Sequence, residues 1–350
     1  MGLYDLDKEQ FSDILKNYPK FRVSQMMHGV YSNFLFPQDI LELPGSLRQE
    51  LSAHESLLPS LRETTRSVSD KGLTVKYLFS LNDGRQIESV LMYGPKSVTV
   101  CISSQAGCAM SCQFCATGDA GFDRHLTIGE IVEQVVTAAR ETKQNGRRLD
   151  HVVYMGMGEP LANYEPVLGS LRRIIGTMGL SARKITLSTV GIVPGINRLA
   201  EEKLAINLAV SLHAANDELR STLVPINKKY PIEMLMKACK NYLKNTNRRI
   251  SFEWALMAGV NDSGSDAKEL AQLAKELYPA AHVNLIPLNP TAGAAVKGLS
   301  APSGDNVNRF SSILSALGVN VTIRRTRGRD IDAACGQLAG THGKKKISLR

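Results

Sequence analysis

Three cysteines with the spacing C-x3-C-x2-C are the residues of this chain best suited to chemistry. Cys108, Cys112 and Cys115 lie in the stretch QAGCAMSCQFCATG. Thiolates bind iron–sulfur clusters, and a 4Fe–4S cluster normally takes four protein ligands. Because only three cysteines are close in sequence, one iron is left open for a substrate or cofactor. The spacing therefore indicates a 4Fe–4S cluster with an open coordination position.

A structural zinc ion is the alternative interpretation of this cysteine group. Such a site takes four ligands, usually as two pairs. The chain has no second C-x2-C pair, and Cys239 has no cysteine near it in sequence. His125 is a candidate fourth ligand, although its spacing is not typical. A non-catalytic RNA-binding protein with a structural zinc therefore stays open as a distant alternative.

Small or polar residues end several strand-like runs of the chain. One run leads into MGMGEPLAN, where Gly158 lets the backbone approach a ligand and Glu159 can accept hydrogen bonds from an amino group. Later runs end in further candidates: Ser188, Ser211, Leu212, His213 and Asn289. Taken alone, each is equally a cap or turn residue, and a lone histidine is more often structural. Their recurrence at successive strand ends predicts a ligand pocket.

Two more cysteines, Cys101 and Cys335, stand outside the C-x3-C-x2-C group. Cys239 falls in a helical pattern and is interpreted as an ordinary buried thiol. Cys335 instead lies in the polar stretch RGRDIDAACGQL, close to acidic residues and to four arginines: Arg324, Arg325, Arg327 and Arg329. Because nearby cations lower the pKa of a thiol, we expect Cys335 to be partly ionised and reactive.

The elements that must position these residues follow a regular alternation from Val98 onward. The expected strands are Val98–Ile102, His151–Met155, Ile185–Thr189, Ile206–Leu212, Ile250–Leu256 and His282–Pro287, with a further strand at Val319–Arg325. The expected helices between them are Ile128–Arg140, Tyr164–Met178, Ile232–Leu243, Ala267–Leu277 and Val307–Leu317. Alternating strands and helices are typical of an α/β fold with a parallel sheet.

Six such units are fewer than the eight of a closed barrel. We therefore predict an open, partial (β/α)6 barrel related to the TIM barrel, with a doubly wound sheet left open by the pattern alone. In both folds ligands bind at the C-terminal ends of the strands. The cysteine group directly follows the first expected strand and so lies at this edge.

Other segments flank this core. Short amphipathic patterns at Leu6–Leu15, Phe21–Phe34 and Leu47–Leu57 predict a small helical accessory domain, and Asp83-Gly84 predicts a hairpin between Leu73–Leu81 and Gln86–Tyr93. Thr291–Asp305 is rich in Gly, Ala, Ser and Pro and is expected to be a loop. The expected domains are 1–72 (helical), 73–95 (β-hairpin extension), 96–340 (core) and 341–350 (basic tail with Lys344, Lys345 and Lys346).

Composition limits the class of protein. The 350 residues are 43% hydrophobic and 21% charged, as in globular proteins, and six cysteines are too few for a disulfide scaffold. We expect a cytoplasmic protein without a membrane span, because no signal peptide and no apolar run of about 18 residues is apparent. The net charge of +9 favours an anionic partner such as nucleic acid, although a merely basic soluble protein fits the charge equally well.

Several motifs together resemble the RlmN/Cfr family of radical S-adenosylmethionine (SAM) RNA adenine methyltransferases. They are CISSQAGCAMSCQFCATG, MGMGEPLAN, LSTVGI, SLHA, GVNDS and DIDAACGQL, and the resemblance extends from about Phe21 to Gly340. It implies a radical SAM barrel with a 4Fe–4S cluster on Cys108, Cys112 and Cys115. It also implies that SAM is bound by Gly158, Glu159, Ser188, Ser211, Leu212, His213 and Asn289.

The resemblance further implies three catalytic residues. Cys335 would carry the methyl group as S-methylcysteine, Cys101 would resolve the product through a disulfide bond, and Glu88 would be the general base. Two SAM molecules would be used per turnover: one methylates Cys335, and the other yields the radical that activates that methyl group. Glu88 is otherwise an unremarked strand residue, so its role rests on the resemblance alone.

The stretches FEW at Phe252 and RRTRG at Arg324 are closer to the RlmN branch. That branch methylates carbon 2 of an adenosine in 23S rRNA, in the peptidyl transferase centre, and of the tRNA adenosine 3′ of the anticodon. Methylation of carbon 8 of the same rRNA adenosine, as in the Cfr branch, is the nearer alternative. The implied partners are 23S rRNA, tRNA and an electron donor such as flavodoxin or ferredoxin, and we expect a monomer.

Overall fold

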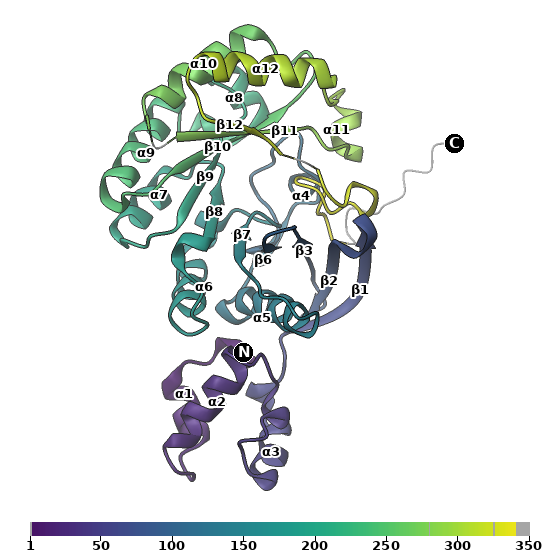
Figure 1. The fold of residues 1–350 in the computed structure, drawn as a ribbon, viewed down its shortest axis with the longest axis vertical. Coiled ribbons are helices and arrows are strands. Elements are labelled where there is room, and N and C mark those ends of the chain that lie inside the picture. Colours follow the sequence, from purple (N-terminus) through teal and green to yellow (C-terminus); the bar gives the residue numbers. More distant parts are fainter. Residues whose placement is uncertain (1, 280, 325, 341–350) are drawn as a thin grey trace.

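One ten-stranded sheet runs through the larger part of the molecule (Figure 1). The structure, a computed structural model, describes residues 2–279, 281–324 and 326–340. In spatial order the strands are β1 (Leu61–Ser69), β2 (Thr74–Leu81), β3 (Gln86–Tyr93), β4 (Val98–Cys101), β7 (His151–Tyr154), β8 (Ile185–Thr189), β9 (Asn207–Ser211), β10 (Ile250–Leu256), β11 (Ala281–Pro287) and β12 (Val321–Ile323). A separate two-stranded ribbon pairs β5 (Gln105–Gly107) with β6 (Phe122–His125).

Within the large sheet, β4, β7, β8, β9, β10, β11 and β12 are parallel to one another and follow one another in chain order. A doubly wound sheet would reverse its strand order at a switch point, so that alternative is wrong and the predicted open, partial barrel is confirmed. The helices that accompany these strands are α5 (Ile128–Gln144), α6 (Tyr164–Gly176), α7 (Val193–Glu201), α8 (Asp217–Leu223), α9 (Ile232–Thr246), α10 (Gly264–Lys275) and α12 (Gly304–Ala316).

The start of helix α5 is determined by a capping box. Thr127 accepts a hydrogen bond from the Glu130 backbone N–H (3.2 Å), and the Glu130 carboxylate accepts one from the Thr127 N–H (2.9 Å). This capping box satisfies two backbone donors at the helix start. The apolar face that follows is buried against the sheet, because Ile131, Val132 and Val135 have no exposed surface.

The antiparallel extension contains the predicted hairpin and one unpredicted strand. β2 pairs with β3, and Gly84 between them has a φ of 81°, which favours glycine. β1, within the segment expected to be helical, pairs with β2 along the edge of the sheet. Its residues are mostly exposed and polar, so the sequence lacks the apolar alternation by which a half-buried strand is found.

Three helices form a lobe below the barrel in Figure 1: α1 (Lys8–Ile14), α2 (Phe21–Tyr31) and α3 (Gly45–Ser52). They match the amphipathic patterns of the sequence. Two carboxylates tie this part to α5, because Asp5 accepts from the Gly129 N–H (2.7 Å) and Glu133 accepts from the Ser60 N–H (2.8 Å). The domain limits proposed above stay predictions, and the basic tail 341–350 lies outside the described residues.

Several short helices of the described residues were not expected. Besides α7 and α8, the segment Thr291–Asp305 contains α11 (Ala292–Val296) and the start of α12, so the prediction of a loop there is wrong. Thr291 caps α11 by accepting from the Ala294 N–H (3.0 Å). Short helices of this kind depend on such caps and on packing rather than on a long periodic pattern. No described helix is both long and apolar enough to cross a bilayer.

Candidate active site

The cysteine loop begins directly after β4 and is closed at its base by the β5–β6 ribbon. The Cys108 N–H donates to the Gly121 carbonyl (2.7 Å), which joins the two ends of the loop. The short helix α4 (Ala116–Asp119) starts immediately after Cys115. Cys108, Cys112 and Cys115 therefore lie on one compact loop at the C-terminal edge of the parallel strands, as predicted.

Burial sets the ionisation of these thiols. It raises the pKa of Cys108 to about 12 and that of Cys112 well above its ordinary value, and the charges of neighbouring cysteines raise both further. Iron must therefore displace protons when it binds, as thiolate ligation requires. The loop thus concentrates three thiols within electrostatic reach of one another.

The types of these ligands suit an iron–sulfur cluster, because such clusters are held by cysteine thiolates. Among the described residues, no three His, Cys, Asp or Glu side chains converge closely enough to hold a single metal ion. Cysteines of an iron–sulfur cluster bind different irons and need not converge on a point. His125, the candidate zinc ligand, instead contacts the Gln105 amide through Nδ1 (3.0 Å). The donor set therefore fits a 4Fe–4S cluster held by Cys108, Cys112 and Cys115.

The glycines of MGMGEP are needed because another part of the chain comes close. A Cβ on Gly158, whose φ is 97°, would lie 2.5 Å from the Gln105 side chain, and one on Gly156 would lie 2.7 Å from the Ile102 backbone. The Gln105 side chain also accepts from the Glu159 N–H (2.8 Å). The turn after β7 is thus pressed against the start of the cysteine loop, which places Glu159 beside it.

Glu159 is held as an acceptor at the edge of the sheet. Its carboxylate accepts from the backbone N–H groups of Leu161 (3.0 Å) and Val190 (2.8 Å), which joins the ends of β7 and β8. Burial raises its pKa to about 7, against the opposing effect of these hydrogen bonds. Each oxygen keeps a further lone pair, so Glu159 can still accept from the amino group of a ligand.

A pocket lies at the ends of β7 to β10, and we call it the strand-end pocket. Of the predicted SAM ligands it is lined by Gly158, Glu159, Ser188, Ser211 and His213. Leu212 does not line it, because its side chain has no exposed surface and only its backbone is at this edge. The structure therefore brings together five of the seven residues, which come from the ends of three successive strands, β7, β8 and β9.

His213 is neutral in this setting. Burial, together with the charge of Arg220, lowers its pKa to about 3. Its Nδ1 accepts from the Ala255 N–H (2.9 Å), so Nε2 carries the proton in the tautomer that this hydrogen bond requires. The ring also packs edge-on against Phe114 of the cysteine loop, with centroids 4.5 Å apart. His213 thus links the loop to the strand-end pocket and retains one donor.

Glu253 is a site residue that the sequence analysis missed. It lies in β10, in register with Ser211 of β9 and Asn284 of β11, and it lines the strand-end pocket. Its Oε1 accepts from Asn284 (2.8 Å), whereas Oε2 is buried without a hydrogen-bond partner and lies 3.6 Å from the Arg324 guanidinium. An unpartnered buried acceptor of this kind fits a hydrogen-bond donor on a bound ligand.

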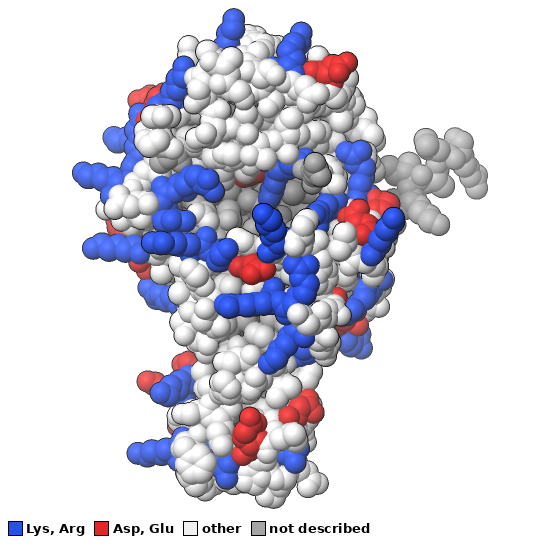
Figure 2. Space-filling model, in the orientation of Figure 1, with Lys and Arg blue, Asp and Glu red and all other residues white. Residues whose placement is uncertain are grey.

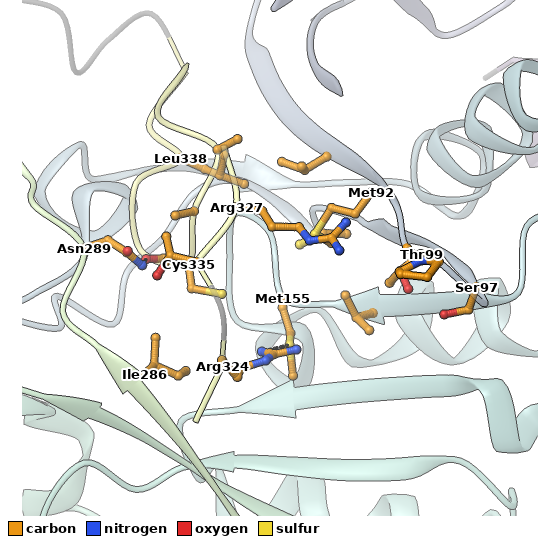
Figure 3. A pocket seen from close by; sticks show the side chains of 18 residues that line it. Met92, Ser97, Thr99, Met155, Ile286, Asn289, Arg324, Arg327, Cys335 and Leu338 are labelled. Carbon is orange, nitrogen blue, oxygen red and sulfur yellow. Dashed lines mark hydrogen bonds between the residues drawn. The ribbon is translucent and has the colours of Figure 1, made fainter. Parts of the chain in front are cut away.

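A second cavity of about 380 Å³ adjoins the strand-end pocket, and we call it the thiol cavity because Cys101 and Cys335 line it. Figure 3 shows Cys335 above Met155 and Arg324, with Met92 and Thr99 on the opposite wall. Cys335 and Arg324 line both the thiol cavity and the strand-end pocket. The two spaces therefore meet at Cys335.

The two thiols of the cavity are free. Burial raises the pKa of Cys101 to about 12, and the neighbouring Cys335 raises it further. The Cys335 side chain is exposed to the cavity, yet the protein atoms around it desolvate it and raise its pKa; Arg324 opposes this shift without overcoming it. The expectation of a lowered Cys335 pKa is therefore wrong, because desolvation outweighs the nearby cation. Arg325 lies outside the described residues.

Two predicted residues lie elsewhere than expected. Asn289 lines the thiol cavity, where its amide donates to the Cys335 carbonyl (3.0 Å) and its Oδ1 is buried without a partner. Glu88 does not line the thiol cavity: it pairs with Lys76 (3.0 Å) and accepts from the N–H groups of Ala339 (2.9 Å) and Gly340 (3.2 Å). In this conformation Glu88 anchors the C-terminal segment, and its role as a base stays a prediction.

Known proteins match both the sequence and this arrangement. A family profile described as the radical SAM superfamily matches residues 102–274. A probable dual-specificity RNA methyltransferase RlmN from Corynebacterium diphtheriae is 45% identical over 96% of this chain and 92% of its own, and one from Parafrankia sp. is 49% identical over 92% and 86%. The crystal structure of a radical SAM methyltransferase from Sphaerobacter thermophilus is 47% identical, with a TM-score of 0.91 over 97% of this chain and 99% of that one.

A more distant structure shares the fold alone. The hydrogenase maturase HydG has a TM-score of 0.51 and 12% identity over 69% of this chain and 55% of its own. The close relatives, in contrast, match over nearly the whole chain, including the cysteine loop and the segment that carries Cys335. This chain therefore belongs to the RlmN family of radical SAM methyltransferases.

Proposed function

We propose that the protein methylates carbon 2 of an adenosine in the peptidyl transferase centre of 23S rRNA and of the tRNA adenosine 3′ of the anticodon. The methyl group passes through Cys335 as S-methylcysteine. The names of the relatives, dual-specificity RNA methyltransferases, support an RNA substrate of two kinds. We place the reaction in the cytoplasm, because both proposed RNA substrates are found there.

One observation carries this proposal: Cys335 lines both the strand-end pocket and the thiol cavity. A residue that accepts a methyl group from one molecule and delivers it to another must face both. Cys335 meets this requirement without any movement of the barrel, since the two spaces share it. The thiol cavity has the volume of a small-ligand site, and its wall of Met92, Val153 and Met155 offers an apolar surface to an unstacked base.

The strand-end pocket is the proposed site of SAM, beside a cluster on Cys108, Cys112 and Cys115. When bound, the cluster and SAM together supply one-electron reductive cleavage that produces a 5′-deoxyadenosyl radical. The protein binds and orients the cofactor through the acceptors of Glu159 and Glu253 and the donor of His213. Two SAM molecules are needed per product, and an electron donor such as flavodoxin or ferredoxin completes the reaction.

Cys101 is proposed as the thiol that releases the product. Transfer of the carbon from S-methylated Cys335 leaves the base joined to the Cys335 sulfur by a methylene group. The Cys101 thiolate then attacks that sulfur, a disulfide forms, and the electron pair of the broken sulfur–carbon bond goes to the methylene carbon, which takes a proton. Cys101 interacts electrostatically with Cys335 across the cavity, and Asn289 holds the Cys335 backbone.

Removal of the proton from the base is assigned to Glu88. For this role its carboxylate must leave the backbone N–H groups of Ala339 and Gly340. RNA would reach the site through the hollow in Figure 2, where Lys and Arg side chains border the opening and acidic ones are fewer. The target base must unstack to enter the thiol cavity. Phosphate contacts at this basic rim would hold the flanking nucleotides.

Analysis of RNA nucleosides tests the proposal. RNA from cells that lack the gene is digested and compared by liquid chromatography and mass spectrometry with RNA from the parent strain. Loss of 2-methyladenosine from 23S rRNA and tRNA is the expected result. Loss of 8-methyladenosine instead would establish the Cfr-type alternative. Purified protein that contains zinc and no iron would establish the non-catalytic alternative.

A further inference from the structure

Arg220 of α8 is a fully buried cation beneath the strand-end pocket. Its side chain has no exposed surface. The guanidinium donates to the carbonyls of Val190 (2.6 Å) and Leu212 (3.1 Å) and to Asn227 Oδ1 (2.7 Å), with a longer contact to the Ser211 carbonyl (3.3 Å). It therefore braces the C-terminal ends of β8 and β9 and the turns after them, where Ser188, Ser211 and His213 lie.

All of these acceptors are neutral. No carboxylate among the described residues pairs with Arg220; the side chain of Asp217 contacts Asn227 (2.9 Å) rather than the guanidinium. Burial lowers the Arg220 pKa to about 10, which still leaves it protonated at neutral pH. A buried charge without an ion pair is costly, and Asp217 acts on Arg220 only as a nearby charge without a direct contact.

The charge lies against the cysteine loop. The N–H of Gln113, next to Cys112, donates to the carbonyl of Leu223 (3.0 Å), one turn after Arg220 on the same helix. The Cys112 side chain packs in one apolar cluster with Leu223 and Val224. The helix that carries the buried charge of Arg220 is therefore in direct contact with the cysteine loop.

We propose that Arg220 is a fixed positive charge that raises the reduction potential of the iron–sulfur cluster. The inference rests on the iron–sulfur part of the proposed function. Uptake of one electron makes the thiolate-bound cluster more negative by one unit, and a nearby buried cation stabilises that added charge more than it stabilises the oxidised form. Arg220 touches neither substrate nor cofactor, so it acts on the reaction through the cluster.

The packing around Arg220 preserves this arrangement. Gly191 of the LSTVGI stretch has a φ of 105°, and a Cβ there would lie 3.1 Å from the Leu235 side chain and 3.4 Å from the Arg220 guanidinium. A side chain at position 191 would therefore press on the arginine. The glycine leaves room for the guanidinium to reach the Val190 carbonyl.

The test is the midpoint potential of the reconstituted protein, measured by dithionite titration with redox mediators and electron paramagnetic resonance, without SAM or RNA. Arg220→Gln removes the charge and keeps donors, and Arg220→Lys keeps the charge. Arg248→Gln is the matched control: it removes one positive charge near the start of β10, where Arg248 contacts Asn207 (2.7 Å). We expect a lower potential for Arg220→Gln, and potentials near that of the unaltered protein for the other two variants.

Each outcome of this experiment either supports or overturns the role of Arg220. An Arg220→Gln protein with a full cluster and an unchanged potential would overturn the inference, as would an equal decrease in Arg248→Gln. If Arg220→Gln folds but cannot be loaded with iron, restored loading in Arg220→Lys supports the inference, and failure of both variants to load overturns it. Unaltered protein that binds no iron contradicts the proposed function itself, whereas an unchanged potential in a loaded variant contradicts only the role of Arg220.

Discussion

At the scale of single residues, the six cysteines differ by what surrounds them rather than by their chemistry. Cys239 is fully buried in α9 among core side chains, which agrees with its interpretation as a structural thiol. Cys108, Cys112 and Cys115 share one loop, and Cys101 and Cys335 share one cavity. These surroundings lead to different expectations when each thiol is removed.

Replacement of Cys112 by alanine is expected to abolish the cluster and the activity. The loop has no spare thiol, because Cys101 and Cys335 belong to the adjoining cavity. Cys239→Ala is the matched control: it should cost about 1 kcal/mol of stability through lost packing and leave iron binding intact. Iron and sulfide are measured on the anaerobically reconstituted proteins. Full iron content and turnover in Cys112→Ala would contradict the assignment of the cluster.

Replacement of Cys101 by alanine is expected to trap the RNA on the protein. Without the second thiol, the methylene bridge between the base and Cys335 cannot be resolved. Denaturing electrophoresis of Cys101→Ala purified from cells should show a band that shifts back after RNase treatment, and Cys101→Ala/Cys335→Ala should show none. A folded Cys101→Ala protein with normal turnover and no shifted band would show that Cys101 is merely a buried strand residue.

The unpartnered oxygen of Glu253 leads to an expectation for cofactor affinity. Glu253→Gln keeps an acceptor for Asn284 but replaces the free oxygen with a donor and leaves Arg324 without its ion pair. Loss of one hydrogen bond to a charged group costs about 1.5–3 kcal/mol, so SAM affinity should fall by at least about tenfold. Calorimetric titration of reconstituted protein measures it, with exposed Glu165→Gln as control. Unchanged affinity would place Glu253 outside the SAM site.

Residue types and spacing were enough to place the three cysteines on one loop at the strand ends, but they did not single out Glu253 or Arg220. The cysteines form a compact motif, whereas Glu253 enters the site only because the register of three parallel strands aligns it with Ser211 and Asn284. Arg220 lies on a seven-residue helix that has no periodic pattern of its own. Such positions depend on pairing between distant segments, which a single sequence does not reveal.

At the scale of elements, the buried parallel strands could be predicted because their sequences are short runs of β-branched residues bounded by turns. Each expected strand of the barrel is present. Exposed or very short elements could not be predicted in this way. β1 is an edge strand with mostly polar residues, and α11 has only five residues. Local sequence therefore predicts an element well where both of its faces are buried, because burial requires apolar residues on both.

The stability of the fold is expected to decrease as the pH rises, because of the buried carboxyl group of Glu133 on α5. Burial raises the pKa of Glu133 to about 8 in the folded protein, above its value of about 4.5 in the unfolded chain. Between these values the folded state retains a proton that the unfolded state has lost. The free energy of unfolding therefore decreases with rising pH, by up to about 1.4 kcal/mol per pH unit from this group.

Urea unfolding of the unaltered protein and of Glu133→Gln between pH 5 and 8 measures this contribution. The variant cannot titrate at this position, so its stability should decline less steeply with pH. Glu165→Gln, an exposed replacement on α6, should follow the unaltered protein. Parallel pH profiles for the unaltered protein and Glu133→Gln would show that the buried carboxyl does not couple folding to pH.

At the scale of the whole molecule, the C-terminal segment completes the site from a long distance in sequence. The Ala116 N–H donates to the Gly336 carbonyl (2.8 Å), and Gln337 donates to the Pro290 carbonyl (2.9 Å). These contacts hold Cys335 over the strand ends and join it to the cysteine loop. Sequence motifs indicated that Cys335 belongs to the site, but only tertiary contacts show that it lies between two pockets.

The charge of the whole molecule leads to an expectation for RNA binding. The chain carries a net charge of +9, and basic side chains border the hollow on the face shown in Figure 2. Contacts to phosphates release counterions, so log affinity should fall linearly with log salt concentration, with a slope of about −0.7 per phosphate on a single strand. Filter binding of an RNA fragment, repeated at KCl concentrations from about 50 to about 300 mM, measures this slope.

Two variants with the same change in net charge distinguish local from overall charge. Arg327 lines the thiol cavity, where its side chain donates to the Tyr93 carbonyl (2.8 Å), whereas Lys240 of α9 pairs with Glu276 (2.7 Å). Arg327→Gln should weaken binding and flatten the slope by about one phosphate contact, and Lys240→Gln should do neither. Equal effects in both variants would mean that net charge alone attracts RNA. A flat salt response in the unaltered protein would mean that stacking of the base, not charge, supplies the affinity.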